Sequence, residues 1–323
     1  MAQIRSKPFG VTKEGANVTE YILSNPGGLT ISVLDYGCVI KSIIVPAKNG
    51  PVDVVVGHDT MADYEADFNS SGSTCCGAFV GRYANRIENA VFTVGGKTYQ
   101  LEANNGPNHL HGCFSRKLYR VKSFGDTLLM EAESPDGEDG FPGNLKIAVR
   151  YTLTEDNAFR MDYRVSSDAD TIVNLTNHSY FNLDGGGDVL NQKLRIYASR
   201  YLEGNNQCCP TGAILPVADT PMDFTAGKLI GREIDTGFAQ TTMVGGGYDH
   251  CYVIDRARGS SQSICAWATS DKTGISMKLY TTQPGIQLYT ANFLQDCPSP
   301  GKGGKPLQKY GGFARETQHY PCS

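Results

Sequence analysis

His178 lies in a stretch of polar and aromatic residues, Asn174-Leu-Thr-Asn-His-Ser-Tyr-Phe-Asn-Leu-Asp-Gly185. If this stretch is an extended strand, alternation turns His178, Tyr180 and Asn182 to one face of a sheet. That face could meet a polar ligand while the opposite face packs on a core. For an isolated histidine, a hydrogen-bonded place in the core is the better interpretation. Two other polar clusters in the sequence favour a ligand site instead.

The first of these clusters is Gly81-Arg-Tyr-Ala-Asn-Arg-Ile87, which contains Arg82, Asn85 and Arg86. Asparagine both donates and accepts hydrogen bonds, and arginine presents a rigid fork of donors, so these side chains could hold sugar hydroxyls. A solvated turn is the alternative interpretation. The second cluster is Phe313-Ala-Arg-Glu-Thr-Gln318, in which the apolar neighbours of Glu316 argue against an ordinary surface carboxylate.

Two further histidines, His109 and His111, lie in Asn104-Asn-Gly-Pro-Asn-His-Leu-His-Gly112 and would share one face of a strand. Their spacing suits a metal, but no third ligand follows at a familiar spacing. The ten cysteines contain no C-x-x-C pair, which also argues against zinc. We therefore predict no metal site here, and a turn that runs into a strand is the structural alternative.

Three residues in the last third of the chain have side chains that suit a sugar. Asp249, at the start of an apolar strand, either caps a turn or accepts hydrogen bonds from hydroxyls. Gln287 follows in a strand-like segment, and its amide both donates and accepts. Phe293 offers an aromatic face, which suits the C–H surface of a sugar, although a large sheet also needs aromatics for packing.

Short runs with alternating hydrophobicity, separated by Gly and Pro, dominate the sequence. This pattern is typical of antiparallel sheets. Helical patterning is scarce, with one or two turns expected over 61–67. The Gly95-Gly96 and 155–157 turns predict hairpins. We therefore predict a single all-β domain, a large antiparallel β-sandwich, with strands at 16–23, 29–33, 39–45, 52–56, 91–101, 145–154, 159–165, 194–198, 248–254, 263–268, 275–281 and 286–291.

Composition excludes several functional classes. The formal charge of -4 and pI of about 5.9 argue against nucleic acid or an acidic membrane as the main partner. No apolar run reaches transmembrane length, and no signal peptide is visible, so we expect a cytoplasmic protein with reduced cysteines. No Gly-rich phosphate loop leads from a strand into a helix, so we predict no nucleotide cofactor.

Taken together, the polar segments resemble the aldose 1-epimerase (galactose mutarotase) family. The resemblance runs from about residue 28 to 320, and similar segments occur in the same order. No single segment is decisive, but the set is highly specific. The segments are Gly81-Arg-Tyr-Ala-Asn-Arg-Ile87, Asn105-Gly-Pro-Asn-His-Leu-His-Gly112, Asn177-His-Ser-Tyr-Phe-Asn-Leu183, Pro210-Thr-Gly212, Tyr248-Asp-His250, Gln283-Pro-Gly-Ile-Gln287 and Gly312-Phe-Ala-Arg-Glu-Thr-Gln318.

The resemblance implies a catalytic acid–base pair in an open cleft on one sheet of the sandwich. His178 would be the general acid and Glu316 the general base for opening and closing a hexose ring, each favouring the charged form of the other. Such chemistry needs no cofactor or metal. The sugar would be held by residues that the resemblance or the residue types single out, namely Asn85, Arg86, His111, Tyr180, Asp249, Gln287 and Phe293.

Two features depart from the family pattern. The segment after His111 is shorter than usual, which affects one rim of the cleft. The chain also ends seven residues after Glu316, so it is either naturally short or lacks the family's final C-terminal strand. Two other functions stay open: a hexose-6-phosphate epimerase, with Arg82, Arg86 and Arg315 available for phosphate, and a non-catalytic sugar-binding or regulatory module. The sequence leaves the oligomeric state, monomer or dimer, undetermined.

Overall fold

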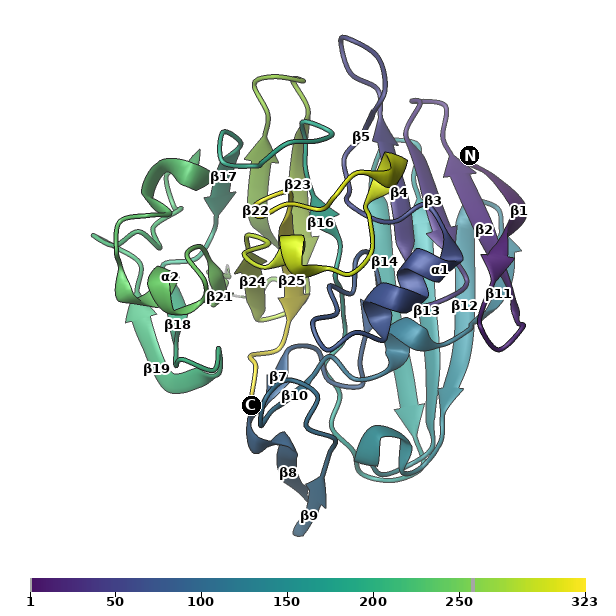
Figure 1. The fold of residues 1–323 in the computed structure, drawn as a ribbon, viewed down its shortest axis with the longest axis horizontal. Helices are drawn as coiled ribbons and strands as arrows, with labels where there is room; N and C mark the ends of the chain where they lie inside the picture. Colours follow the sequence, from purple (N-terminus) through teal and green to yellow (C-terminus); the bar gives the residue numbers. More distant parts are fainter. Residues whose placement is uncertain (1, 257–258) are drawn as a thin grey trace.

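The computed structural model describes residues 2–256 and 259–323, and its framework consists of antiparallel strands in two layers (Figure 1). The first layer begins with a five-stranded sheet in the order β1 (Gln3–Val11), β2 (Asn17–Ser24), β3 (Thr30–Leu34), β4 (Ile40–Val45) and β5 (Val52–Asp53). It continues with a six-stranded sheet in the order β16 (Tyr180–Phe181), β25 (Phe313–Gln318), β24 (Gly285–Tyr289), β21 (Asp249–Val253), β18 (Arg200–Gly204) and β19 (Pro210–Pro216).

The two sheets of the first layer are joined where β5 gives way to β16. Val55 forms an antiparallel bridge with Phe181, and the Val56 N–H donates to the Tyr180 carbonyl over 2.9 Å. The hydrogen-bonded surface therefore runs from the N-terminal strands to the strand that carries Glu316.

The second layer covers the inner face of the first. One part has the order β11 (Arg120–Phe124), β12 (Thr127–Ser134), β13 (Leu145–Leu153) and β14 (Phe159–Ser167). The other has the order β20 (Lys228–Leu229), β17 (Lys193–Ile196), β22 (Ser263–Thr269) and β23 (Ser276–Thr281). Three short strand pairs complete the fold: β7 (Arg86–Ile87) with β10 (His109–Leu110), the buried pair β6 (Phe79–Val80) with β15 (Thr176–Asn177), and β8 (Val91–Val94) with β9 (Lys97–Gln100).

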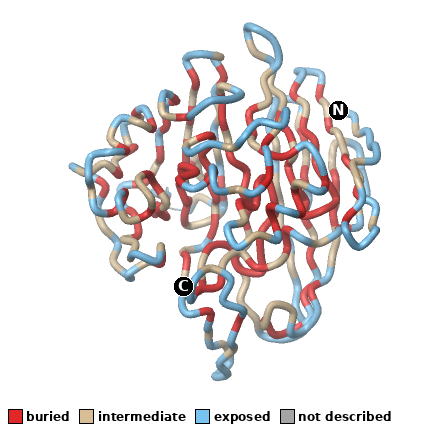
Figure 2. The backbone as a smooth tube through the Cα atoms, in the orientation of Figure 1, coloured by how far each residue is buried: buried red, intermediate tan, exposed pale blue. Residues whose placement is uncertain are grey.

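Strand alternation separates a core face from an outer face on the first layer. On β24, Ile286 and Leu288 belong to the main buried cluster, which also takes Val149 from β13 and Ala266 from β22. Figure 2 shows the same pattern, with buried residues concentrated in the middle strands and exposed ones in the loops. The intervening residues of β24 point to the other face, where a polar cleft lies.

These observations confirm the predicted all-β antiparallel sandwich. The expected hairpin at Gly95 and Gly96 is present, and both glycines have the positive φ that the turn requires (57° and 76°). The predicted short helix is α1 (Met61–Phe68), capped by Thr60, whose hydroxyl accepts from the Asp63 N–H. A second helix, α2 (Ala239–Met243), was not predicted.

One local prediction was wrong. The stretch around His178 is not a continuous strand, because β15 ends at Asn177 and β16 begins at Tyr180. The Asn177 side-chain oxygen accepts from both the backbone N–H (3.0 Å) and the hydroxyl (2.6 Å) of Ser179. This Asx-type turn competes with the ladder and breaks the strand at the histidine. Within the described residues, no helix is long and apolar enough to cross a membrane.

Candidate active site

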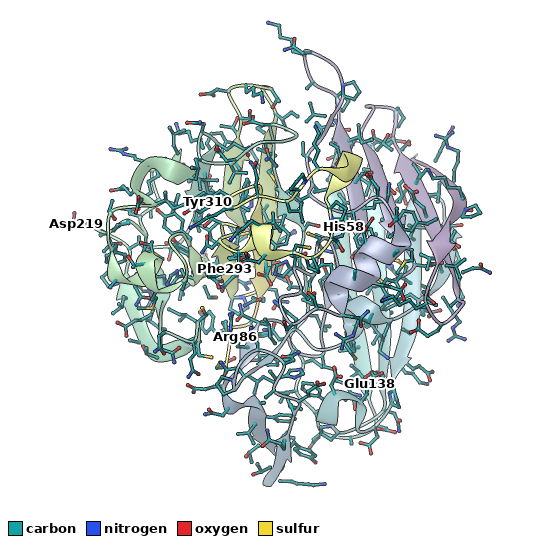
Figure 3. All side chains as sticks on the ribbon, viewed as in Figure 1. His58, Arg86, Glu138, Asp219, Phe293 and Tyr310 are labelled. Carbon is teal, nitrogen blue, oxygen red and sulfur yellow. The ribbon has the colours of Figure 1, made fainter. Side chains whose placement is uncertain are left out.

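A cleft of about 870 Å³ opens on the outer face of the first layer. Its floor is the junction of β16, β25, β24 and β21, and its walls come from loops that follow α1 and flank β7 and β10. Figure 3 labels two of its residues: Phe293 lies over the middle strands, and Arg86 lies below them, on β7. The cleft is lined by His178 and Glu316 and by five of the predicted sugar-binding residues besides Phe293: Asn85, Arg86, His111, Tyr180 and Asp249.

Strand register explains how residues distant in sequence meet on this floor. On β25, Ala314 pairs with Tyr180 of β16 on one side and with Tyr289 of β24 on the other. Tyr289 in turn pairs with Asp249 of β21. The small side chain of Ala314 leaves room between the two tyrosines, and Glu316, two residues further along β25, projects from the same face.

His178 and Glu316 form the central pair of the cleft. Nε2 of His178 lies 3.5 Å from Oε1 of Glu316, and both side chains are buried, with exposed fractions of 6% and 3%. The remaining polar atoms, Nδ1 of His178 and Oε2 of Glu316, have no hydrogen-bond partner among the described residues. Buried polar groups are normally paired, so these two atoms are free to meet a ligand.

Burial drives the two pKa values of this pair toward the neutral forms. Burial lowers the pKa of His178 to about 4, an effect that the nearby backbone of His178 itself and the charge of Asp249 only partly oppose. Burial also raises the pKa of Glu316 to about 8, with Asp249 adding to the rise and Arg86 opposing it. Contrary to the sequence-based expectation, loss of solvation outweighs the attraction between opposite charges.

This pKa pattern still leaves the pair with one proton near neutral pH. As the pH falls, the pair binds its first proton with an apparent pKa of about 8 and its second proton with an apparent pKa of about 4. Between these limits the proton lies on Glu316 or on His178, and because the groups are coupled, the titration belongs to the pair. A pair that holds one proton can take a proton and give one in the same cycle.

His111 supplies a hydrogen-bond donor beside this pair. Its ring centroid lies 4.9 Å from that of His178, in an edge-on arrangement. The Asn85 backbone N–H donates to Nδ1 of His111 over 3.1 Å, so the proton of the neutral imidazole lies on Nε2. Burial, with smaller effects from His178 and Arg86, keeps the His111 pKa well below its usual value. His111 is therefore a neutral donor.

Two charged groups, Arg86 and Asp249, also lie near the pair. The Arg86 Nε donates to the Asn105 side-chain oxygen (3.0 Å), and its Nη1 lies 3.9 Å from an Asp249 carboxylate oxygen. The other Asp249 oxygen accepts from Nε2 of Gln287 at 2.7 Å. Gln287 is 3% exposed and does not line the cleft, so it contacts the site through Asp249.

Two predicted aromatics frame the cleft. The Tyr180 ring is buried against His178, at 5.0 Å between centroids, and lies 6.0 Å from the Tyr289 ring. Phe293 is half exposed at the rim, and its backbone N–H donates to the Tyr289 hydroxyl over 3.1 Å. An exposed aromatic at the edge of a polar cleft suits the apolar face of a sugar.

Other residues that the sequence suggested lie elsewhere. Arg82 is buried behind the cleft, where its guanidinium donates to backbone carbonyls of the segment before β13. Arg315 alternates with Glu316 on β25 and points into the sandwich, between the rings of Phe181 and Phe313. His109 does not share a face with His111, because the positive φ of His111 (62°) ends the strand between them.

Sequence reasoning missed several residues that line the cleft. Tyr289 could have been found, because it follows Gln287 by two residues on a predicted strand and therefore shares its face. Asn105 lay in a quoted motif, but its role in positioning Arg86 depends on the fold. Cys208, Arg116 and the polar segment 69–74 come from loops and a short helical turn whose position alternation cannot predict.

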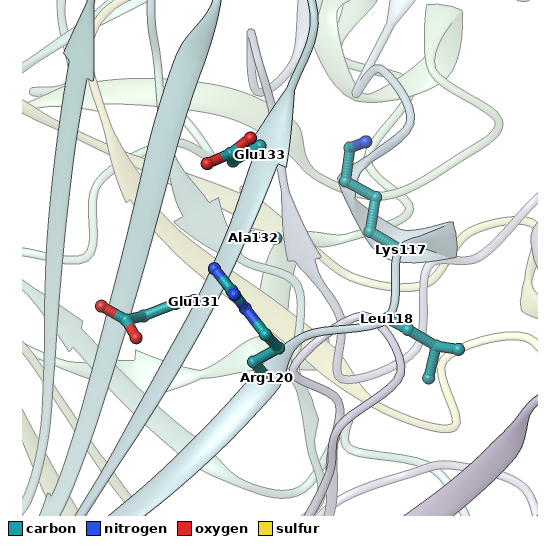
Figure 4. A pocket seen from close by; sticks show the side chains of 6 residues that line it. All are labelled: Lys117, Leu118, Arg120, Glu131, Ala132 and Glu133. Atoms are coloured by element: carbon teal, nitrogen blue, oxygen red, sulfur yellow. The ribbon is translucent and has the colours of Figure 1, made fainter.

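Among the described residues, two groups of donor side chains are close enough together to hold a metal ion, and one is in this cleft. One ligand atom each from His111, His178 and Glu316 lies within 4.8 Å of the others. The same three atoms suit an acid–base site, and the absence of a metal requirement stays a prediction. A separate hollow on β11 and β12, shown in Figure 4, is lined by Lys117, Leu118, Arg120, Glu131, Ala132 and Glu133. It lacks the orphaned polar atoms that mark the cleft.

The fold and the cleft together define an antiparallel β-sandwich enzyme with a buried imidazole–carboxylate pair for a small polar substrate. A sequence model of the aldose 1-epimerase family matches residues 19–323. The galactose mutarotase of Sus scrofa is 35% identical over 99% of this chain and 91% of its own. The aldose 1-epimerase of Escherichia coli K12 is also 35% identical, over 93% and 86%.

The solved structures agree with the sequence relatives. An aldose epimerase homologue from C. elegans superposes with a TM-score of 0.85 at 30% identity, covering 98% of this chain and 91% of that one. The chain therefore belongs to the aldose 1-epimerase family.

Proposed function

We propose that this protein interconverts the α and β anomers of free hexoses such as galactose and glucose, in the cytoplasm. The observation that carries the proposal is the contact between His178 Nε2 and Glu316 Oε1 at 3.5 Å, in two cleft-lining residues that each keep a polar atom without a hydrogen-bond partner among the described residues. The names of the relatives support the choice of substrate. All ten cysteines are free, which supports a reducing compartment.

The reaction needs one proton acceptor and one proton donor. We assign Glu316 as the base that takes the proton from the C1 hydroxyl and His178 as the acid that protonates the ring oxygen. The C1–ring oxygen bond then breaks, giving the open-chain aldehyde. After rotation about C1–C2, the ring oxygen attacks the other face of the aldehyde, and both protons return. Each positioned group contributes roughly 10²–10⁴-fold.

Substrate binding also sets the starting protonation state. Burial alone places the shared proton on Glu316, whereas the mechanism starts with a carboxylate and an imidazolium. Sugar hydroxyls donate hydrogen bonds to a carboxylate and therefore favour its charged form. We infer that the bound sugar shifts the proton from Glu316 to His178.

The other predicted residues hold the sugar. Asp249 accepts from hydroxyls and is itself oriented by Gln287, while Arg86 and His111 donate. The backbone N–H of Asn85 fixes the tautomer of His111. Tyr180 and Phe293 contribute aromatic faces for the apolar surface of the sugar. We propose that residues 1–323 act as one aldose 1-epimerase domain; its oligomeric state, monomer or dimer, is open.

Free sugars suit the cleft better than sugar phosphates. Two of the three arginines considered for a phosphate, Arg82 and Arg315, are buried away from it. Among described lining residues the cations are Arg86 and Arg116, and Arg86 is already engaged with Asp249. We expect a higher kcat/KM for glucose than for glucose 6-phosphate, and the reverse order would favour the phosphate branch.

Polarimetry tests the proposal directly. Freshly dissolved α-galactose and α-glucose are followed with and without EDTA-treated protein. The proposal predicts mutarotation faster than in buffer alone, with no metal or nucleotide added. A rate equal to that of the buffer, together with sugar binding measured by calorimetry, would establish a non-catalytic binding module instead.

A further inference from the structure

A second cluster of metal-binding side chains lies outside the sugar cleft. One ligand atom each from His58, Asp67 and Cys297 lies within 4.8 Å of the other two. The His58 and Asp67 side chains are fully buried, and Cys297 is partly exposed. His58 precedes α1, Asp67 lies in its last turn, and Cys297 follows the short helical turn Leu294–Asp296. Figure 3 shows His58 close to α1.

The histidine and the carboxylate are oriented as metal ligands usually are. Nδ1 of His58 lies 2.7 Å from the Pro300 carbonyl oxygen, which can only accept, so Nδ1 carries a proton. Nε2 then faces Oδ2 of Asp67 at 3.2 Å, and the other Asp67 oxygen accepts from the Thr74 N–H at 2.8 Å. A second hydrogen bond of this kind fixes the tautomer and rotamer of metal ligands. Two electron-rich atoms facing each other require a cation between them, either a proton or a metal.

We propose that His58, Asp67 and Cys297 bind a divalent cation of the zinc class. The ligand atoms of one tetrahedral zinc lie about 3.3–3.8 Å apart, so side-chain shifts of about 1 Å convert the observed cluster into such a site. The mixed nitrogen, oxygen and sulfur donors suit zinc, whereas magnesium and calcium prefer oxygen alone.

A further thiol, Cys76, lies beside Asp67, with its sulfur outside the cluster of atoms within 4.8 Å of one another. It is fully buried, and the Thr74 hydroxyl contacts both its sulfur, at 3.0 Å, and the Asp67 carboxylate. A side-chain movement that brought its thiolate to the ion would complete the four-coordinate shell of a structural zinc site.

The position of the site points to a bracing role. Asp67 directly precedes the segment 68–75, which lines one wall of the cleft, and Cys297 directly follows Asp296, which lines the other side with Phe293. A metal held by both residues joins the two walls without contacting the sugar. This role does not depend on the proposed reaction.

A buried ion pair without a metal is the alternative. In the ion pair, Nδ1 of His58 donates to the Pro300 carbonyl and a proton lies between Nε2 and the Asp67 carboxylate. A metal ion must displace this proton and that of the Cys297 thiol, so the zinc site, unlike the ion pair, releases protons when zinc is added to weakly buffered protein.

The test uses the full-length protein stripped with EDTA and titrated with zinc against a chromophoric chelator. We expect one tight equivalent in the wild type and an affinity lower by about tenfold or more in Cys297→Ser and His58→Gln, since even changes outside the ligand shell cost that much. Cys113→Ser, another partly buried thiol, and His178→Asn should both bind zinc as the wild type does. Zinc binding that is lost in His178→Asn and kept in Cys297→Ser would place the ion in the cleft and overturn the proposal.

The absorption spectrum of cobalt bound to the wild-type protein tests the proposal even if the variants do not fold. A thiolate ligand gives a cobalt–sulfur charge-transfer band together with the strong visible bands of tetrahedral cobalt. We expect both, and thermal unfolding should occur at a higher temperature with zinc than with EDTA. Neither cobalt band, or less than a tenth of an equivalent of zinc bound, would show that the cluster is only an ion pair.

Discussion

Two buried polar regions of the molecule, the surroundings of Arg82 and the site around His178 and Glu316, differ in how their hydrogen bonds are satisfied. Arg82 is 1% exposed, and its three nitrogens donate to Ser134, Pro135, Pro142 and Gly143 over 2.7–3.0 Å. In the cleft, by contrast, Nδ1 of His178 and Oε2 of Glu316 have no partner among the described residues, and neither does Oε1 of Gln287 behind Asp249. The first region is complete within the protein, whereas the second requires a ligand.

This difference separates a stabilising site from a functional one more clearly than residue type does. Arg82 and Arg86 belong to one seven-residue motif and were equal candidates for sugar binding, yet only Arg86 reaches the cleft. Missing partners alone do not identify a site either. Arg315 also lacks hydrogen-bond partners, but it packs between aromatic rings in the core. An active site needs both unpaired groups and an accessible cavity.

The largest effect on stability is expected for Arg82→Ala. The change leaves several buried carbonyls without a donor, and each costs about 1–3 kcal/mol. We expect the free energy of unfolding to fall by about 3 kcal/mol or more in urea titrations. Arg86→Ala, four residues later, is the matched control and should unfold within about 1 kcal/mol of the wild type. Equal stability of the two variants would remove the distinction between the regions.

His178→Asn tests the cleft side of the comparison. The variant loses the imidazole but keeps a polar side chain, so kcat should fall by roughly 10²-fold or more, or about 2.7 kcal/mol, with KM little changed. Polarimetry over a range of α-galactose concentrations separates kcat from KM. A variant that loses activity only because it unfolds at assay temperature, seen by circular dichroism, would count against a chemical role.

Smaller effects are expected for residues that hold the sugar. Asp249→Asn and Arg86→Ala should raise KM by about tenfold, or 1.4 kcal/mol, while kcat stays close to the wild-type value. The reason is that contacts with hydroxyls away from C1 are equally strong in the ground state and the transition state. If kcat falls instead and KM does not change, these residues stabilise the transition state.

The smallest predicted effect is on thermal stability and its dependence on pH. Glu316 has a raised folded pKa, of about 8, so its burial costs stability increasingly as pH rises from about 4.5 through 8. His178, with a folded pKa lowered to about 4, costs stability as pH falls from about 6.5 through 4. Glu316→Gln should therefore melt a few degrees above the wild type at pH 8–9, with the difference vanishing near pH 4. A lower melting temperature at pH 9 would contradict this.

Much of the fold could be predicted from the sequence, because alternation and turn residues act locally. The hairpin at Gly95-Gly96 and the strand that became β13 needed no information from elsewhere in the chain. The first strand, β1, escaped prediction because it is mostly exposed and does not alternate, with Pro8 and Gly10 flanking a bulge. Its strand conformation depends on hydrogen bonds to β2, which the local sequence pattern does not reveal.

The site was predicted in its residue types and not in its contacts. Motif resemblance placed His178 and Glu316 together, although 138 positions separate them, and the structure brings them to 3.5 Å. Alternation could not reveal that an Asx turn interrupts the strand at His178, or that Gln287 lies behind Asp249. Nor could residue type reveal that burial outweighs charge attraction in setting the two pKa values.

The central claim is that Glu316 and His178 share one proton and use it to open the sugar ring. The most direct measurement is kcat for EDTA-treated Glu316→Gln at saturating α-galactose, with the pH profile of wild-type kcat/KM alongside. The account predicts a loss of roughly 10²-fold or more in kcat, in a folded protein, and a wild-type bell between apparent pKa values of about 4 and 8. Near-wild-type kcat in folded Glu316→Gln would contradict it.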